Sequence, residues 1–294
     1  MAKAEKTEFR VVVLNLNNFR LEPEKEAPPV SNTKNKKGYT APSAVSSEKF
    51  TATTRLLRRL SPDVLFLAEI GGSMELALLQ SALKKSGLNL PNSKVLQATD
   101  TERRTALLTR FEITTDASQA HVPFSLRGQA FALERGILDL ILETPNETRF
   151  RFIGLHLKSR LESAHFDQAA FRLREAHKIR EHLDEIFAGK EKLPLLVAGD
   201  LNSTPNEEIL KIILGVRGTP GYLHSISLRD KRNEVWTHYW KEAATYSKID
   251  YIIASPELAA SVVRSKSGID AARDAHLVSD HRAIFANFKI TKSK

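Results

Sequence analysis

Polar residues recur at the ends of short apolar runs along this chain, and this pattern restricts the folds that the chain can adopt. The runs indicate strands at residues 11–14, 64–68, 106–109, 130–142, 152–157, 195–198, 249–254 and 283–288. A continuous apolar run of this kind indicates a strand buried on both faces. The polar residues at or near strand ends are Asn15, Glu69, His156, Asp200 with Asn202, Asp250, and Asp280 with His281. Because polar groups are costly to bury, their repetition at strand ends predicts a site at the edge of a sheet.

Helical patterns alternate with these strands along the whole length. Apolar residues at helical spacing predict helices at residues 50–60, 74–83, 169–186 and 206–214. The dipeptide Ser61-Pro62 predicts the end of the first helix. In the third helix, Arg172, Lys178 and Glu181 are expected on the outer face. Interspersed strands and helices, without an internal repeat or a dividing linker, favour one α/β domain over residues 1–294 with sheets covered by helices.

Residues 21–49 differ in composition from the rest of the chain. The stretch is rich in Pro, Ser, Lys and Asn and poor in large apolar residues, which predicts a flexible loop or insertion. Lys34, Lys36 and Lys37 lie within it. Contact with an anionic ligand and simple solvation of loop charges both remain open for these lysines.

Composition narrows the class of function. The formal net charge is +9, which favours an anionic partner such as nucleic acid, acidic lipid headgroups or a phosphorylated metabolite over a basic surface kept for solubility. The absence of cysteine excludes disulfides, zinc thiolate sites and thiol nucleophiles. No apolar run is long enough to cross a bilayer, and the first residues lack the apolar core of a secretory signal. We therefore expect a cytoplasmic protein with no membrane partner.

The polar residues at the strand ends form a coherent set of metal and acid–base groups. Each one alone has an ordinary structural explanation, such as a helix cap for Glu69, a core histidine for His156 or a salt bridge for Asp250. Together, their carboxylate and amide oxygens suit Mg²⁺ or Mn²⁺ better than Zn²⁺. The adjacent Asp280 and His281 add a carboxylate beside an imidazole that titrates near neutrality.

The order of these segments resembles the endonuclease/exonuclease/phosphatase family. The matching segments are Leu14-Asn15, Ala68-Glu69, His156-Leu157-Lys158-Ser159, Gly199-Asp200-Leu201-Asn202, Ile249-Asp250-Tyr251 and Ser279-Asp280-His281. They extend from residue 11 to residue 288 with their neighbouring strands. The resemblance implies a four-layer α/β sandwich of two mixed, mostly antiparallel sheets flanked by helices, with the site at one edge between the sheets.

The resemblance also implies a role for each polar residue. Asn15, Glu69 and Asp280 would hold the metal, Mg²⁺ or Mn²⁺. Asp200 would orient or activate the attacking water. Among the remaining catalytic residues, Asn202 would help to grip the phosphate, and His281 would contact the scissile phosphate or act as the acid/base partner. His156 would donate to a non-bridging phosphate oxygen, and Asp250 would orient a histidine that the sequence does not identify. The implied chemistry is in-line attack of water on phosphorus.

Four further residues match the substrate-binding positions more loosely. Arg103 precedes a central strand, where an arginine can reach phosphate. Asn17 lies two residues after Asn15, so it is expected on the same side of the strand. Lys158 and Arg160 make their segment more basic than in DNA-repair members, which favours either a second phosphate or exposed charges after a strand. The chain departs from the family at Ala68, where Gln is common, and at Lys248, where Arg is common.

We therefore expect a metal-dependent hydrolase of phosphodiester bonds, most simply a nuclease acting on DNA or RNA. A phosphatase or phosphodiesterase for a lipid headgroup or small metabolite would need the same site and a different rim. A nucleic-acid-binding protein without catalysis would require the loss of a metal ligand, and all of the proposed ligands are present. Fold resemblance does not choose among DNA, RNA and small substrates, and it leaves endo or exo action and the oligomeric state open.

Overall fold

The computed structural model describes residues 6–21, 44–160 and 167–291, and two six-stranded sheets form its centre. In spatial order the first sheet contains β15 (Gly268–Ile269), β16 (Ile284–Thr291), β1 (Lys6–Phe19), β2 (Val64–Ile70), β4 (Arg104–Thr109) and β3 (Asn92–Val95). The second contains β11 (His224–Ser225), β14 (Asp250–Ala254), β10 (Leu195–Asp200), β9 (Arg149–His156), β8 (Leu138–Glu143) and β5 (Glu112–Asp116). Two hairpins lie outside these sheets: β6 (Pro123–Leu126) with β7 (Gln129–Ala132), and β12 (His238–Trp240) with β13 (Thr245–Ser247).

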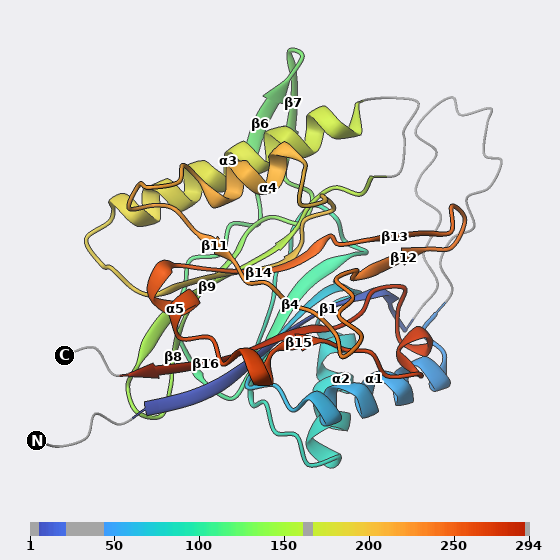
Figure 1. Ribbon diagram of the computed structural model, residues 1–294. Helices are drawn as coiled ribbons and strands as arrows, with labels where there is room; N and C mark the ends of the chain where they lie inside the picture. The colour runs from blue at the N-terminus through green and yellow to red at the C-terminus, as the bar shows by residue number, and fades with distance from the viewer. Residues whose placement is uncertain (1–5, 22–43, 161–166, 292–294) are drawn as a thin grey trace, which may run out of the picture.

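Helices cover the outer face of each sheet, so the molecule has four layers (Figure 1). The helices are α1 (Ser47–Leu60), α2 (Ser73–Lys85), α3 (Gln168–Ala188), α4 (Glu208–Leu214) and α5 (Pro256–Ala260), with 3₁₀ turns at Arg264–Lys266 and Ala275–Leu277. Helices α1 and α2 pack on the first sheet, and α3 and α4 pack on the second. Each sheet is antiparallel except for one central parallel pair. The predicted α/β sandwich of two mixed sheets is confirmed.

Burial on both faces explains why the central strands are continuously apolar. In β1, Val11 and Val13 point into the core between the sheets, whereas Val12 and Leu14 point into the core beneath α1 and α2. Phenylalanine rings fill the space between the sheets, including Phe66 against Phe152 at 6.0 Å between ring centroids. Because both faces of the strand are covered, only its end is free to carry polar groups to a site.

The parallel pairs bring the polar strand ends together. In the first sheet Asn15 of β1 lies opposite Ala68 of β2, and in the second sheet His156 of β9 lies opposite Asp200 of β10. Asp250, at the start of β14, pairs with Asp200 in antiparallel register. The carboxyl ends of a parallel pair meet at the same edge of a sheet. Since the two sheets face each other, both sets of polar residues converge at one edge of the sandwich.

Gly199 permits the close approach of β9 and β10 at this edge. Its φ of +145° lies in a region that side-chain-bearing residues rarely adopt, and a Cβ there would meet the carbonyl oxygen of Leu155 at 1.8 Å. Glycine avoids both the backbone strain and the collision. The glycine before Asp200 is therefore required to seat Asp200 beside His156.

The first helix begins earlier than the sequence pattern predicts. It starts at Ser47 and not at residue 50, because the Ser46 side chain caps it by accepting a hydrogen bond from the Lys49 backbone N–H at 3.1 Å. The end at Ser61 is confirmed. The predicted loop at 21–49 is thus wrong for residues 47–49. Residues 22–43, including Lys34, Lys36 and Lys37, lie outside the described residues.

Two other expectations are corrected. The predicted strand at residues 130–142 is two strands, since β7 ends at Ala132 and β8 begins at Leu138. Arg172 is buried and does not lie on the outer face of α3. Its guanidinium turns toward the segment after β9 and donates a hydrogen bond to the Ser159 carbonyl at 2.8 Å. That segment covers a face of α3 that the helical pattern alone assigned to solvent.

Among the helices in the described part of the chain, none combines the length and the apolar character required to span a membrane.

We predict that Gly199→Ala lowers the free energy of unfolding by about 3 kcal/mol or more, because it adds a backbone collision to an unfavourable φ. Gly128→Ala is the matched control: its φ is +79°, but a Cβ there meets nothing within 4 Å. The control variant should lose about 1 kcal/mol. Chemical denaturation measures both values, and equal losses would show that the approach of β9 and β10 does not depend on Gly199.

Candidate active site

The buried carboxylate of Asp200 links the two sheets at the edge of the sandwich. Its Oδ2 accepts a hydrogen bond from the Asn15 side-chain amide of the first sheet at 3.0 Å. Its Oδ1 accepts one from the Asn202 backbone N–H at 2.8 Å. The Nε2 atoms of His156 and His281 lie 3.8 and 3.7 Å from Oδ2. Burial, and next the negative charge of Asp250, raise the pKa of Asp200 to about 7.

Asn15 and Glu69 form the part of the site that the first sheet supplies. The Asn15 side-chain amide donates to Glu69 Oε1 at 3.1 Å, and the Asn18 backbone N–H donates to Glu69 Oε2 at 3.0 Å. The residues Asn17, Asn18, Glu69 and Asn202 all have positive φ values, from 47° to 60°. Non-glycine residues adopt this region rarely, and such strain clusters at functional sites. Strands β1 and β2, and the turn after β10, therefore depart from regular strand geometry where their polar residues reach the site.

Asp250 pairs with His281, so His281 is the histidine that the sequence could not identify as the partner of Asp250. The distance from His281 Nδ1 to Asp250 Oδ2 is 2.9 Å, and both side chains are buried. Burial alone would lower the pKa of His281, but the charges of Asp250 and Asp200 raise it to about 10. The imidazole is therefore protonated at neutral pH, and Asp250 fixes its orientation.

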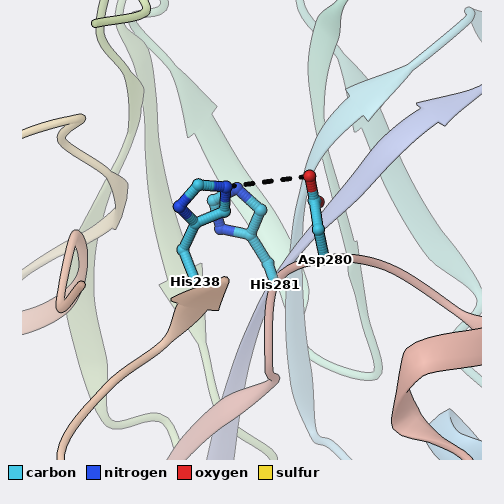
Figure 2. A group of neighbouring side chains, drawn as sticks. All are labelled: His238, Asp280 and His281. Carbon is cyan, nitrogen blue, oxygen red and sulfur yellow. Dashed lines mark ion pairs between the residues drawn. The ribbon is translucent and has the colours of Figure 1, made fainter. Parts of the chain in front are cut away.

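Asp280 and His238 complete this side of the site (Figure 2). His238 Nε2 lies 3.7 Å from Asp280 Oδ2, and the His238 and His281 ring centroids are 4.5 Å apart. The pKa of Asp280 is lowered, because the contact with His238 and the charge of His281 outweigh the opposing effect of burial. Sequence reasoning missed His238, since β12 is short and lacks an apolar run. Its one signal is a histidine beside aromatic residues shortly before the Ile249-Asp250-Tyr251 segment.

Lys49 is a second residue that sequence reasoning missed. Its ammonium donates to the Asn17 carbonyl at 2.7 Å. Burial lowers its pKa, whereas the negative charges of Asp280 and Glu69 oppose this effect. Lys49 therefore lies near two carboxylates that are far apart in the sequence, Glu69 and Asp280. The Ser46 cap, which places Lys49 in the first helical turn, was the signal available in the sequence.

His156 stays neutral, although its Nε2 lies within 4 Å of the carboxylates of Glu69 and Asp200. Burial lowers its pKa well below the usual value, and the charges of Arg135, His281, Arg103 and Lys158 lower it further. Arg103 and Lys158, both predicted to bind substrate, thus lie near His156. Each also contacts a carboxylate, Arg103 that of Asp100 at 3.9 Å and Lys158 that of Glu134.

Two further buried charged residues, Arg135 near His156 and Glu175 beside Lys158, were not predicted. Arg135 pairs with Asp100 at 2.9 Å and with Glu134 at 3.1 Å. Glu175 of α3 accepts a hydrogen bond from the Lys158 backbone N–H at 2.7 Å, and burial raises its pKa to about 7. These residues come from a loop and a helix without a recognisable motif, so only the folded chain brings them to Lys158 and its neighbours.

Three predicted residues contact the site differently from expectation. Asn17 meets Asn15 through its backbone N–H, which donates to Asn15 Oδ1 at 2.9 Å, because its left-handed φ breaks the alternation of the strand. The Asn202 side-chain amide donates to the Leu157 carbonyl at 3.0 Å and so links the segments after β9 and β10. Arg160 pairs with Glu207 at 3.2 Å and is partly exposed.

We predict that Asp250→Asn lowers the pKa of His281 by about 1 to 3 pH units, because the charge that most raises it is removed. Titration of the histidine ring signals by nuclear magnetic resonance measures this value, with His281→Gln used to assign the signal and circular dichroism to confirm folding. An unchanged His281 titration would mean that Asp250 does not set the charge of the imidazole.

Solved structures with this fold include several that cover nearly the whole chain. The human Nocturnin catalytic domain, solved with a bound sulfate anion, has a TM-score of 0.64 at 18% identity, covering 97% of each chain. Truncated TDP2 from Caenorhabditis elegans has a TM-score of 0.60 at 17% identity, covering 96% of this chain and 98% of that one. A family protein from Bacteroides thetaiotaomicron has a TM-score of 0.62 at 16% identity, covering 98% and 97%. At these identities the likeness shows the fold alone.

Sequence comparison supplies the family. No curated protein matches the chain. The sequence profile described as the Endonuclease/Exonuclease/phosphatase family matches residues 14–281, which include every residue of the site described above. The resemblance noted from the strand-end residues is confirmed, and the chain belongs to the endonuclease/exonuclease/phosphatase family, whose members are metal-dependent phosphoesterases.

Proposed function

We propose that the chain hydrolyses phosphodiester bonds in nucleic acid by in-line attack of water, with Mg²⁺ or Mn²⁺ as its cation. The observation that carries this proposal is the convergence on Asp200. This buried carboxylate has a raised pKa and accepts a hydrogen bond from an amide of the facing sheet. It lies within 4 Å of two histidines, of which His156 is neutral and His281 is positively charged. Pairs of groups whose pKa values are pushed apart are typical of acid–base sites.

Asn15, Glu69 and Asp280 would hold the cation. Their side chains offer amide and carboxylate oxygens, which are the donors that Mg²⁺ and Mn²⁺ prefer. Lys49 supports this assignment in one respect: the negative charges of both Glu69 and Asp280 act on its ammonium and oppose the lowering of its pKa by burial, so the two carboxylates act together on one positive charge. When bound, the cation would neutralise negative charge that develops on the phosphate oxygens.

Asp200 would orient the attacking water and accept its proton. A carboxylate with a pKa near 7 is a much better proton acceptor than an ordinary aspartate at the same pH. The bonds from Asn15 and Asn202 engage one lone pair on each of its oxygens and hold the carboxylate in place. This geometry requires no covalent bond between enzyme and substrate.

The two histidines would bind the phosphate in different ways. His281 carries a proton and a positive charge, so its Nε2–H would donate to a phosphate oxygen and stabilise the growing negative charge. His156 is neutral, and its Nδ1 is buried without a hydrogen-bond partner among the described residues. The other ring nitrogen, Nε2, lies 3.7 Å from Glu69 Oε1 and 3.8 Å from Asp200 Oδ2, and as an N–H donor it would contact a phosphate oxygen bound there.

Charge favours nucleic acid as the substrate. The chain carries a formal charge of +9, and Arg103, Arg135 and Lys158 lie near His156. A polyanion gains from such a field at several phosphates, whereas a single headgroup gains at one or two.

We predict that the protein cleaves labelled single-stranded DNA, duplex DNA or RNA with Mg²⁺ or Mn²⁺ and not with EDTA. Glu69→Ala should lower kcat/KM by about 100-fold or more, since it removes an oxygen ligand from the site of charge stabilisation. Glu112→Ala is the matched control, because Glu112 is exposed on β5 of the second sheet. Each protein is assayed in parallel on the nucleic acids and on a generic bis-ester phosphate.

The outcomes separate the candidate functions. Metal-dependent hydrolysis of the bis-ester without cleavage of nucleic acid would support the phosphodiesterase activity and would indicate a lipid headgroup or small metabolite as the substrate. Binding of nucleic acid without turnover of any substrate would favour a binding protein. Cleavage that Glu69→Ala leaves intact would refute the proposed cation site.

A further inference from the structure

His238, Asp280 and His281 present three metal-ligating side chains at one point of the site (Figure 2). Each offers one ligand atom, and these atoms all lie within 4.8 Å of one another. The backbone holds the two segments together, because His238 forms a β-bridge with His281 and the Tyr239 N–H donates to the Asp280 carbonyl at 3.0 Å. The cluster is therefore built into the fold and does not depend on a chance approach of surface side chains.

The outer ring nitrogens of both histidines already have partners. His281 Nδ1 lies 2.9 Å from Asp250 Oδ2, and His238 Nδ1 lies 3.4 Å from Ser247 Oγ. Histidines that bind metals nearly always use one ring nitrogen for the metal and donate the other N–H to a carboxylate or another oxygen. Here His238 Nε2 lies 3.7 Å from Asp280 Oδ2, and His281 Nε2 lies 3.7 Å from Asp200 Oδ2, so in both histidines Nδ1 has the supporting contact and Nε2 is the nitrogen left for a metal.

We propose that His238, Asp280 and His281 form a second cation site, which takes Zn²⁺ and shares Asp280 with the oxygen-lined site at Asn15 and Glu69. Two imidazoles and one carboxylate are a donor set of three-ligand zinc sites, with water in the fourth position. Mg²⁺ prefers oxygen ligands, so the two histidines favour Zn²⁺ at this site, although Asp280 is common to both sites.

The geometry lies close to that of a bound ion. Tetrahedral ligands about 2.1 Å from Zn²⁺ are about 3.4 Å from each other. His238 Nε2 and Asp280 Oδ2 are 3.7 Å apart, so these two donors need only a small rotation. The Asp280 side chain is 40% exposed, which leaves it room to turn and leaves the site open to an ion from solution.

Zinc at this position would inhibit hydrolysis, a consequence that rests on the proposed function. It would displace the proton of His281 Nε2, which is proposed to donate to the phosphate, to solvent, and it would bind Asp280, which is proposed to bind the catalytic cation. The chain would then respond to Mg²⁺ and to Zn²⁺ in opposite directions, and His238 would determine the second response.

The direct test is titration of metal-free protein with Zn²⁺ alone, followed by isothermal calorimetry. His238→Ala should weaken Zn²⁺ binding by at least about 10-fold. Glu69→Ala should change it by less than about 3-fold, since Glu69 belongs to the other site. His276→Ala, at an exposed histidine outside the cluster, is the matched control. His238→Gln, which keeps a polar side chain of similar length, provides a second variant, and circular dichroism verifies folding.

Equal Zn²⁺ affinity in the original protein and both His238 variants would overturn the proposal. Equal losses in His238→Ala and Glu69→Ala would do the same, because they would show that Zn²⁺ binds at the oxygen-lined site and not at a separate histidine site. In the presence of Mg²⁺, inhibition by Zn²⁺ should require at least about 10-fold more Zn²⁺ in His238→Ala. Failure of the proposed function would appear separately, as no hydrolysis by the original protein with Mg²⁺ or Mn²⁺, and the binding titrations would still decide the zinc site.

Discussion

The burial of the Asp200 carboxylate is the constraint on which the rest of the site depends. Removing a carboxylate from water costs several kcal/mol unless hydrogen bonds and charges compensate. This cost is a large share of the free energy of unfolding of a typical domain. Asn15 compensates from the facing sheet, Asn202 from the following turn, and His281 from the C-terminal segment. Asp200 therefore ties together parts of the chain that are far apart in sequence. The glycine before it is needed because only a residue without Cβ lets β10 lie so close to β9.

The distribution of charge around Asp200 gives its neighbouring side chains different protonation states. Two carboxylates, Asp200 and Asp250, lie against one imidazole, so His281 holds its proton strongly. His156 has burial and four positive charges against it, and it stays neutral. Glu69 and Asp280 face a buried ammonium on the other side. One small region thus contains a carboxylate with a raised pKa, a protonated imidazole, a neutral imidazole and a partly buried ammonium, and the proposed attack of water on a phosphodiester rests on this set of groups.

Sequence reasoning succeeded where local signals and structure coincide. Val11 to Leu14 are apolar because both faces of β1 are covered, so the position of Asn15 at the end of the run could be recognised. The same reasoning located Glu69, His156 and Asp200, and the order of these segments identified the family.

Sequence reasoning failed where the only signal is a contact between distant segments. The pairing of Asp250 with His281 and the arrival of His238 beside Asp280 depend on the register of the sheets. Lys49 was missed because a cap at Ser46 extends α1 into a stretch whose composition resembles a loop. Arg172 was placed on the outside because helical periodicity does not show what a neighbouring segment covers.

The central claim is that burial and the charge of Asp250 make Asp200 a proton acceptor suited to neutral pH. The most direct measurement is the pH titration of the Asp200 carboxyl carbon by nuclear magnetic resonance in metal-free protein, with Asp200→Asn used to assign its signal. The account predicts a midpoint near pH 7, as the pKa of about 7 requires. A midpoint near 4, the range of an ordinary aspartate, would contradict it and would remove the basis for assigning Asp200 as the residue that activates water.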